Sequence, residues 1–247
     1  MSLVIKNLCK HFENNEDATL NEINLEVENG EFVCIVGVSG CGKSTLLNLV
    51  AGLIQPSSGQ ILLDGKEITG PGADRTVMFQ EHGLYPWLSV IENVKFGMKL
   101  EGVSKEKQEE KALHYLEMVG LLEYRDYPIH QISGGMRQRT ALARALTMDS
   151  SILLMDEPFS ALDKQTSNKL REELQRIWQQ TKRTILFITH SVEEAVYLGD
   201  RVVVLSPDPE KQVDVIDINI ERPRHVYSQE FVDLRHRILD EIRGEAL

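Results

Sequence analysis

The sequence predicts an α/β fold built on a mostly parallel β-sheet. Short apolar runs rich in β-branched residues, at residues 32–36, 151–155 and 184–188, have the pattern of buried strands. Segments with helical periodicity lie between them, for example residues 162–178. Strands that alternate with helices are typical of a parallel sheet with helices on both faces. Polar residues follow several of the strands, so we expect a ligand site at the carboxyl edge of the sheet.

Composition limits the classes of protein to consider. The chain has 247 residues, of which 42% are hydrophobic and 26% charged, as in an ordinary globular protein with a sizeable core. Its net charge of −11 disfavours nucleic acid as a partner, because that affinity comes largely from Lys and Arg. No apolar run approaches the roughly 18–20 residues that cross a bilayer, and the start does not resemble a signal peptide. The three cysteines are unpatterned, so we expect a reducing compartment.

Residues 37–45 fit the phosphate-binding pattern G-x-x-x-x-G-K-[ST]. An apolar strand precedes them, and a helix that places Leu46, Leu47, Leu49 and Val50 on one side follows. A glycine-rich loop that leads into a helix N-terminus presents backbone N–H groups to a polyphosphate. We therefore expect nucleotide contacts from Gly37, Ser39, Gly40, Cys41, Gly42, Lys43, Ser44 and Thr45. Lys43 would meet the β- and γ-phosphates, and the Ser44 hydroxyl would meet Mg²⁺.

The N-terminal part reads as strands at residues 2–8 and 20–28, with a polar loop between them. Phe12 stands at the start of this loop. Its ring could stack on a nucleotide base, but an aromatic residue at a strand end more often belongs to the core. Further strands are expected at residues 60–65 and 75–79, the second of which ends at Gln80.

From residue 86 to about residue 150 the pattern is helical, with Ser104 as the N-cap of a helix over residues 105–119. The strand at residues 151–155 runs into Asp156 and Glu157.

The strand at residues 184–188 leads to Thr189 and His190, after which residues 191–194 have the pattern of a capping box. Strands at 201–205 and 213–220 close the sheet. A C-terminal helix follows, and its apolar stripe is expected to pack on the domain rather than on a partner.

The polar residues at the strand ends suit phosphoryl chemistry. Mg²⁺ takes few protein ligands, so Ser44 and one carboxylate such as Asp156 suffice. Glu157 could polarise an attacking water, and Gln80 and His190 could each donate a hydrogen bond to that water or to a γ-phosphate. Adjacent carboxylates also occur by chance, and a lone histidine is more often structural. The assignment of these strand-end residues to phosphoryl chemistry therefore depends on the phosphate loop.

Residues 132–139, Ile-Ser-Gly-Gly-Met-Arg-Gln-Arg, resemble the signature sequence of ABC ATPases. The other motifs stand in that family's order: phosphate loop, Gln80, signature, Asp156-Glu157, residues 160–163, His190. The resemblance extends from residue 3 to about residue 220. It implies a P-loop NTPase of ABC type, whose parallel core carries an antiparallel β lobe and an inserted helical lobe. We expect one domain over residues 1–247, with its core at 1–85 and 151–225, the helical lobe at 86–150 and a C-terminal helix at 226–247.

The resemblance also implies a head-to-tail dimer that sandwiches two ATP molecules. Independently, Ser133, Gly134 and Gly135 open a helix that runs through Leu146 and so form a second anion site. By family pattern, Phe12 stacks on adenine and His190 contacts the γ-phosphate. Gln80 touches metal and water, and Glu157 is the general base. Ser133 and Gly135 contact the partner's ATP, and Asp163 couples the two sites. Met136 departs from the family, which usually has Gln there; the serine and glycines carry the phosphate contacts, so we expect activity to survive.

The same resemblance implies an importer, in which separate integral-membrane permease subunits dock near Gln80 at the cytoplasmic face of the membrane. A solute-binding protein would take part indirectly. Residues 83–94, with Pro86-Trp87, look like the nitrate, sulfonate and taurine importer group, and thiamine-precursor importers are close to it. Tyr85 and Trp87 could be an exposed aromatic anchor for the permease or part of the lobe core.

Two other classes of protein fit less well. A non-transport ABC protein of DNA repair or the ribosome would carry a long coiled-coil insertion or two ATPase units, and neither is present. A nucleotide-dependent kinase would not carry the signature.

Overall fold

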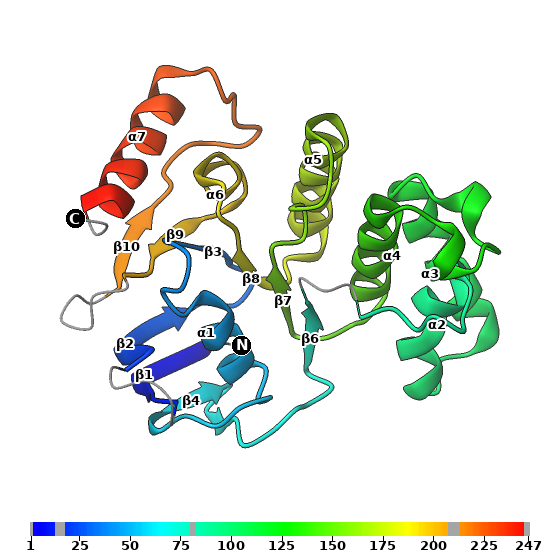
Figure 1. Ribbon diagram of the computed structural model, residues 1–247, viewed down its shortest axis with the longest axis horizontal. Helices are drawn as coiled ribbons and strands as arrows, with labels where there is room; N and C mark the ends of the chain where they lie inside the picture. Colours follow the sequence, from blue (N-terminus) through cyan, green and yellow to red (C-terminus); the bar gives the residue numbers. More distant parts are fainter. Residues whose placement is uncertain (1, 13–17, 80–82, 207–212, 245–247) are drawn as a thin grey trace.

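A computed structural model describes residues 2–12, 18–79, 83–206 and 213–244, and its centre is a six-stranded sheet (Figure 1). The strand order is β10 (Asp214–Asp217), β9 (Arg201–Val204), β3 (Phe32–Val36), β8 (Thr184–Ile188), β7 (Ile152–Asp156) and β6 (Arg75–Met78). All neighbouring pairs are parallel except β9 and β10. The predicted parallel core is confirmed.

A second, four-stranded sheet is antiparallel. Its order is β2 (Leu20–Val27), β1 (Leu3–Lys10), β4 (Ser58–Leu63) and β5 (Lys66–Glu67). The first three strands lie within two residues of the predicted bounds, whereas the two-residue β5 was not predicted. In β2 the apolar residues Ile23, Leu25 and Val27 are buried, and the residues between them are exposed, as the alternation predicted.

Four helices pack around these sheets: α1 (Lys43–Val50), α5 (Lys164–Thr181), α6 (Val192–Leu198) and α7 (Gln229–Gly244). The C-terminal helix α7 lies beside α6 and buries Phe231 and Ile238, so its predicted packing on the domain is confirmed (Figure 1).

Residues 90–146 form a group of helices on the side of β6 and β7 away from β9 and β10 (Figure 1). The group consists of α2 (Val90–Leu100), α3 (Lys105–Met118) and α4 (Gly134–Leu146), with short 3₁₀ turns at Leu122–Tyr124 and Ile129–Gln131. Ser104 caps α3 as predicted, and Ser89 and Glu92 form a complete capping box at α2. Among the described residues, no helix has the length and apolar character that crossing a membrane requires.

The buried side chains divide into two apolar clusters. Because side chains alternate along a strand, β3 contributes Phe32, Cys34 and Val36 to one cluster and Val33 and Ile35 to the other. The first cluster includes the apolar residues of α4, and the second includes those of α1. The helix after the phosphate loop and the helix of the signature sequence are thus built on different parts of the core.

Candidate active site at the strand ends

The loop between β3 and α1 has a conformation that only glycine fits at two positions. Gly42 is the N-cap of α1 with a φ of 95°, and Gly37 has a φ of 153°. A Cβ on Gly37 would lie 2.4 Å from the Leu205 carbonyl oxygen, and a Cβ on Gly42 would lie 2.7 Å from Leu20 Cδ2. Both glycines are therefore required by contacts inside this chain.

Lys43 and Ser44 point their polar atoms toward this loop and toward β7. Lys43 Nζ donates hydrogen bonds to the carbonyl oxygens of Gly37 (3.0 Å) and Val38 (2.7 Å). The Ser44 hydroxyl is hydrogen-bonded to the Asp156 carboxylate. Side chains that the sequence placed on different elements are thus brought together, and they offer an ammonium for phosphate and two oxygen ligands that suit Mg²⁺.

Cys41 is the one loop residue whose side chain turns away from solvent. It is 1% exposed and packs within the second apolar cluster. Burial is the main cause that raises the pKa of its thiol, and the Lys43 charge only opposes this effect. Cys41 can therefore contribute to a phosphate site only through its main chain, and its thiol lacks the depressed pKa of a reactive cysteine.

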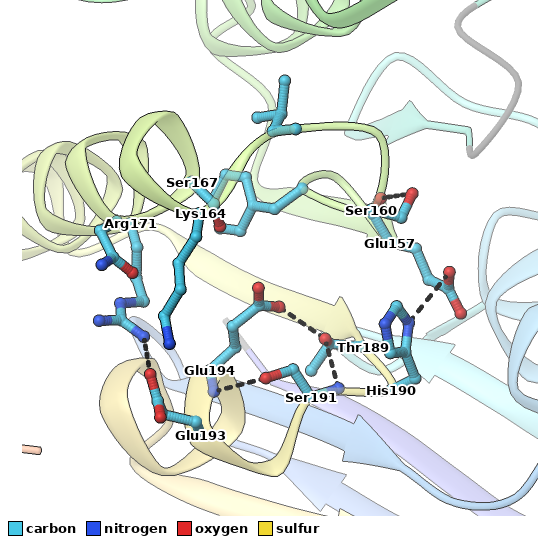
Figure 2. A pocket seen from close by; sticks show the side chains of 13 residues that line it. Glu157, Ser160, Lys164, Ser167, Arg171, Thr189, His190, Ser191, Glu193 and Glu194 are labelled. Carbon is cyan, nitrogen blue, oxygen red and sulfur yellow. Dashed lines mark hydrogen bonds and ion pairs between the residues drawn. The ribbon is translucent and has the colours of Figure 1, made fainter.

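Asp156 and Glu157 follow one another at the end of β7 but have different surroundings. Burial raises the pKa of Asp156, the negative charge of Glu157 raises it further, and the Ser44 hydrogen bond and the Lys43 charge lower it. Glu157 has a left-handed φ of 47°, a conformation that costs about 1–3 kcal/mol outside glycine. This turn directs its carboxylate toward His190, whose Nδ1 lies 3.4 Å from Glu157 Oε2 (Figure 2).

Gln138 of α4 holds the strained turn at Glu157, and sequence reasoning missed it. Its amide Nε2 donates to the Glu157 carbonyl oxygen (3.2 Å), and its Oε1 accepts from the Ala161 N–H (3.1 Å). Gln138 is 1% exposed, and a buried amide needs such partners. A glutamine on the inner face of the signature helix was the available signal. Its partners could not be identified without the fold.

Ser133 caps α4 as expected, and the next two glycines have no conformational requirement within the chain. Ser133 is exposed, and its hydroxyl accepts from the Met136 N–H (3.3 Å). A Cβ on Gly134 would meet nothing within 4 Å, and one on Gly135 would meet only Leu162 Cδ2 at 3.4 Å and the Ala161 carbonyl oxygen at 3.8 Å. Met136 packs half-buried against the first apolar cluster, away from any role in anion binding.

The other predicted site residues lie at the rim. Phe12 is 40% exposed, with Lys10 Nζ 5.0 Å from its ring centroid, so the alternative that it belongs to the core is wrong. Asp163 is the N-cap of α5 and accepts a hydrogen bond from the Thr166 N–H (3.0 Å). The Thr166 side chain is the main cause that lowers the pKa of Asp163, and the Thr166 N–H lowers it further. Gln80 lies outside the described residues.

The capping box predicted at residues 191–194 forms only in part. Ser191 Oγ accepts from the Glu194 N–H (3.3 Å), as a cap should. The Glu194 carboxylate, however, accepts from the Thr189 hydroxyl (2.6 Å), and the Ser191 N–H donates to that hydroxyl instead (3.0 Å). The second half of the predicted box is therefore wrong, because Thr189 supplies a closer partner to both groups.

A cavity of about 330 Å³ opens beside Glu157 and His190 (Figure 2). Its lining comes from the turn after β7, the start of α5 and the start of α6, and it includes Lys164, Arg171 and Glu194. The carboxylate of Glu157 and the imidazole of His190 thus stand at an accessible edge.

Comparisons with known proteins agree with these motifs. The family model for ABC transporters matches residues 20–160. The chain is 50% identical to the uncharacterized ABC transporter ATP-binding protein MJ0412 of Methanocaldococcus jannaschii, over 100% of this chain and 93% of that protein. It is 53% identical to the nitrate import ATP-binding protein NrtD of Synechocystis sp. (77% and 71% covered) and 48% identical to the taurine import ATP-binding protein TauB of Yersinia pestis (81% and 78% covered).

Solved structures give the same answer for the fold. The ATP-binding cassette MJ0796, in a dimeric post-hydrolysis state bound to ADP and Pi, superposes with a TM-score of 0.79 and 30% identity. The match covers 89% of this chain and all of that one. The chain belongs to the ABC transporter family and is one of its ATP-binding, ATP-hydrolysing subunits.

Proposed function

We propose that two copies of this chain bind two MgATP molecules between them and hydrolyse them to power an importer for a small anion. The observation that carries the proposal is the contrast between the two glycine-rich segments. The phosphate loop is crowded by its own chain at Gly37 and Gly42, whereas a Cβ on Gly134 would meet nothing within 4 Å and one on Gly135 would make only ordinary contacts with Leu162 and Ala161. The dimeric state of the MJ0796 cassette supports a partner that approaches this segment.

The residues divide into two groups in this proposal. The loop residues 37–45 bind the phosphates, Lys43 neutralises charge on the β- and γ-phosphates, and Phe12 stacks on the adenine. Ser133, Gly134 and Gly135 contact the ATP held by the partner chain, and Asp163 couples the two sites through the start of α5.

The exposed Ser44 hydroxyl and the buried Asp156 carboxylate fit Mg²⁺, with Gln80 as a further ligand. When bound, the ion would neutralise phosphate charge and orient the terminal phosphate.

Glu157 is the general base in this scheme. Its carboxylate is directed outward by the left-handed turn and lies beside His190, which donates to the γ-phosphate. Gln80 helps to position the water. A base held within hydrogen-bond reach of the attacking water typically contributes 10²–10⁴ in rate.

The permease docks near Gln80 and on Trp87, which lies at the start of the helical lobe that we assign to residues 86–150. Trp87 is 75% exposed, whereas Tyr85 is half-buried and packs on Phe96 with ring centroids 4.3 Å apart. Of the two aromatic residues, Trp87 is thus placed to act as the anchor, and Tyr85 supports it. The relatives named for nitrate and taurine import support an anion as the solute and the inner face of the membrane as the location.

Affinity purification from native membranes tests the transport role. We expect an integral-membrane permease to co-purify with the chain and the Trp87→Ala variant to lose it. Reconstitution of that complex in vesicles with its solute-binding protein should then show ATP hydrolysis that nitrate, a sulfonate or taurine stimulates. Stimulation by a thiamine precursor alone would change the substrate class, and co-purification of ribosomes or DNA would contradict the transport role.

A further inference from the structure

Three hydrogen bonds enclose the peptide of His190 where β8 joins α6 (Figure 2). The Thr189 hydroxyl donates to Glu194 Oε2 (2.6 Å) and accepts from the Ser191 N–H (3.0 Å). The Ser191 hydroxyl accepts from the Glu194 N–H (3.3 Å). The residues on both sides of His190 are therefore tied to the same carboxylate-bearing residue.

The carboxylate of Glu194 lies inward, in the cavity wall between α5 and α6 (Figure 2). Burial raises the pKa of Glu194, and the Thr189 hydrogen bond opposes this effect. The positive charge of Arg171 on α5 lowers the pKa of this carboxylate, and Ser167 of α5, which lines the same cavity, lowers it further. A carboxylate is costly to bury, so its partners have to hold it in one orientation.

The imidazole of His190 has little packing of its own. Its side chain is 66% exposed, and its Nδ1 lies 3.4 Å from Glu157 Oε2. A side chain that projects into solvent depends on its backbone for its position, and small displacements of a reacting group carry large rate penalties. The anchoring of residues 189–194 therefore decides where the imidazole lies.

We propose that Thr189 and Glu194 are positioning residues that fix His190 beside Glu157. The proposal rests on the proposed function, in which His190 contacts the γ-phosphate. Helix α5 has Asp163 as its N-cap, and its residues Ser167 and Arg171 line the same cavity as Glu194. Thr189 acts through His190 and touches no substrate.

Thr189→Val tests this directly, because valine keeps the shape of threonine and removes the hydroxyl. We expect kcat for ATP hydrolysis to fall about tenfold, the loss expected for a hydrogen bond to a charged group, with KM within about twofold. In the nucleotide-free protein, the NMR signal of the His190 ring Cε1–H should shift toward its random-coil position. Thr189→Ser keeps the hydroxyl and should restore both the signal and kcat to within about threefold.

The double variant Thr189→Val/His190→Ala separates a positioning role from a structural one. If Thr189 acts through the imidazole, the double variant should be no slower than His190→Ala alone. Losses that multiply would overturn the proposal, and so would an unshifted ring signal in Thr189→Val. Full activity of His190→Ala would instead refute the role of His190 in the proposed function, so the two failures are distinguishable.

Discussion

Two glycine-rich segments of this chain are assigned to anion binding in our proposal, and they meet different structural requirements. In residues 37–45 two of the three glycines are crowded by the fold, since a methyl group on Gly37 or Gly42 would collide with Leu205 or Leu20, whereas one on Gly40 would meet nothing within 4 Å. In residues 133–135 no such collision exists, and neither Gly134 nor Gly135 has a positive φ. Glycine costs roughly 0.5–1 kcal/mol relative to alanine within a helix, so its presence at the start of α4 needs a reason outside the fold.

The difference shows how to separate folding from function in a single chain. A glycine that the chain itself crowds is explained by stability, and its loss should damage the monomer. The open space at Gly134 is compatible with a close approach from another molecule, which in our proposal is the ATP held by a second chain. The variants that follow either impair one of the two segments or hold both segments on bound ATP. They are ordered from the largest expected effect to the smallest.

Glu157→Gln should hold residues 37–45 of one chain and residues 133–135 of the other together around unhydrolysed ATP. Glutamine keeps the shape of the side chain but cannot accept a proton, so turnover should fall by about 10²–10⁴ while ATP binding remains. An ATP-bound dimer should then accumulate, measurable by light scattering with and without ATP. Glu173→Gln, a carboxylate in a surface ion pair with Arg176 on α5, is the matched control and should behave as wild type. A strictly monomeric Glu157→Gln variant with full activity would refute the role of Glu157.

Lys43→Ala should disable the loop segment alone. Charge-assisted hydrogen bonds are worth about 1.5–3 kcal/mol, so MgATP affinity measured by calorimetry should fall roughly 10- to 150-fold. Lys95→Ala removes an equivalent charge from a surface pair with Glu109 and should leave the affinity unchanged. Unchanged affinity in Lys43→Ala would show that the loop amides suffice without the ammonium.

Gly134→Ala and Gly42→Ala test the comparison itself. Gly134→Ala should keep or slightly raise the melting temperature and leave the ATP affinity of the monomer intact, while ATPase activity falls at least about tenfold, or 1.4 kcal/mol. Gly42→Ala should instead lower the free energy of unfolding by about 1–2 kcal/mol for the left-handed backbone, with a further loss from the contact with Leu20. If both variants lose stability equally, the distinction between the two segments is wrong.

The sequence was sufficient for features whose parts are neighbours along the chain. Gly37 to Thr45 and the strand and helix around them form one continuous segment, so their local pattern predicted the loop. Ser133 likewise caps a helix whose start is readable from nearby residues. The parallel sheet followed from the alternation of strands and helices, and its six strands agree with the prediction.

Features that depend on distant partners could not be predicted in this way. Gln138 meets Glu157 and Ala161 only after α4 packs beside the end of β7. The Glu194 pattern predicted a capping box, but the carboxylate accepts from the Thr189 hydroxyl, and the Ser191 N–H donates to that same hydroxyl. Burial of the Cys41 thiol was equally hidden, since a loop residue is usually exposed.

Asp156→Asn should give the smallest effect. It tests whether Asp156 belongs to a metal site beside the phosphate loop. Burial raises the pKa of Asp156 in the folded state above the unfolded value near 3.9, so ionisation of the folded protein is disfavoured. Below about pH 3.9 the group is protonated in both states and costs nothing, and wild-type stability falls as pH rises through the folded pKa. Asparagine cannot ionise, so without Mg²⁺ the variant should melt a few degrees higher than wild type at neutral pH, with the gain vanishing toward acid.

Magnesium and ATP should reverse this order of melting temperatures between wild type and Asp156→Asn. The wild-type carboxylate gains a counter-charge when the ion binds beside Ser44, whereas the amide does not, so MgATP should raise the melting temperature of wild type more than that of Asp156→Asn. Scanning calorimetry across pH, with and without MgATP, measures both halves. Equal stabilisation of the two proteins by MgATP would remove Asp156 from the metal site. A wild-type advantage at neutral pH without Mg²⁺ would instead show that the Ser44 hydrogen bond outweighs burial of the charge.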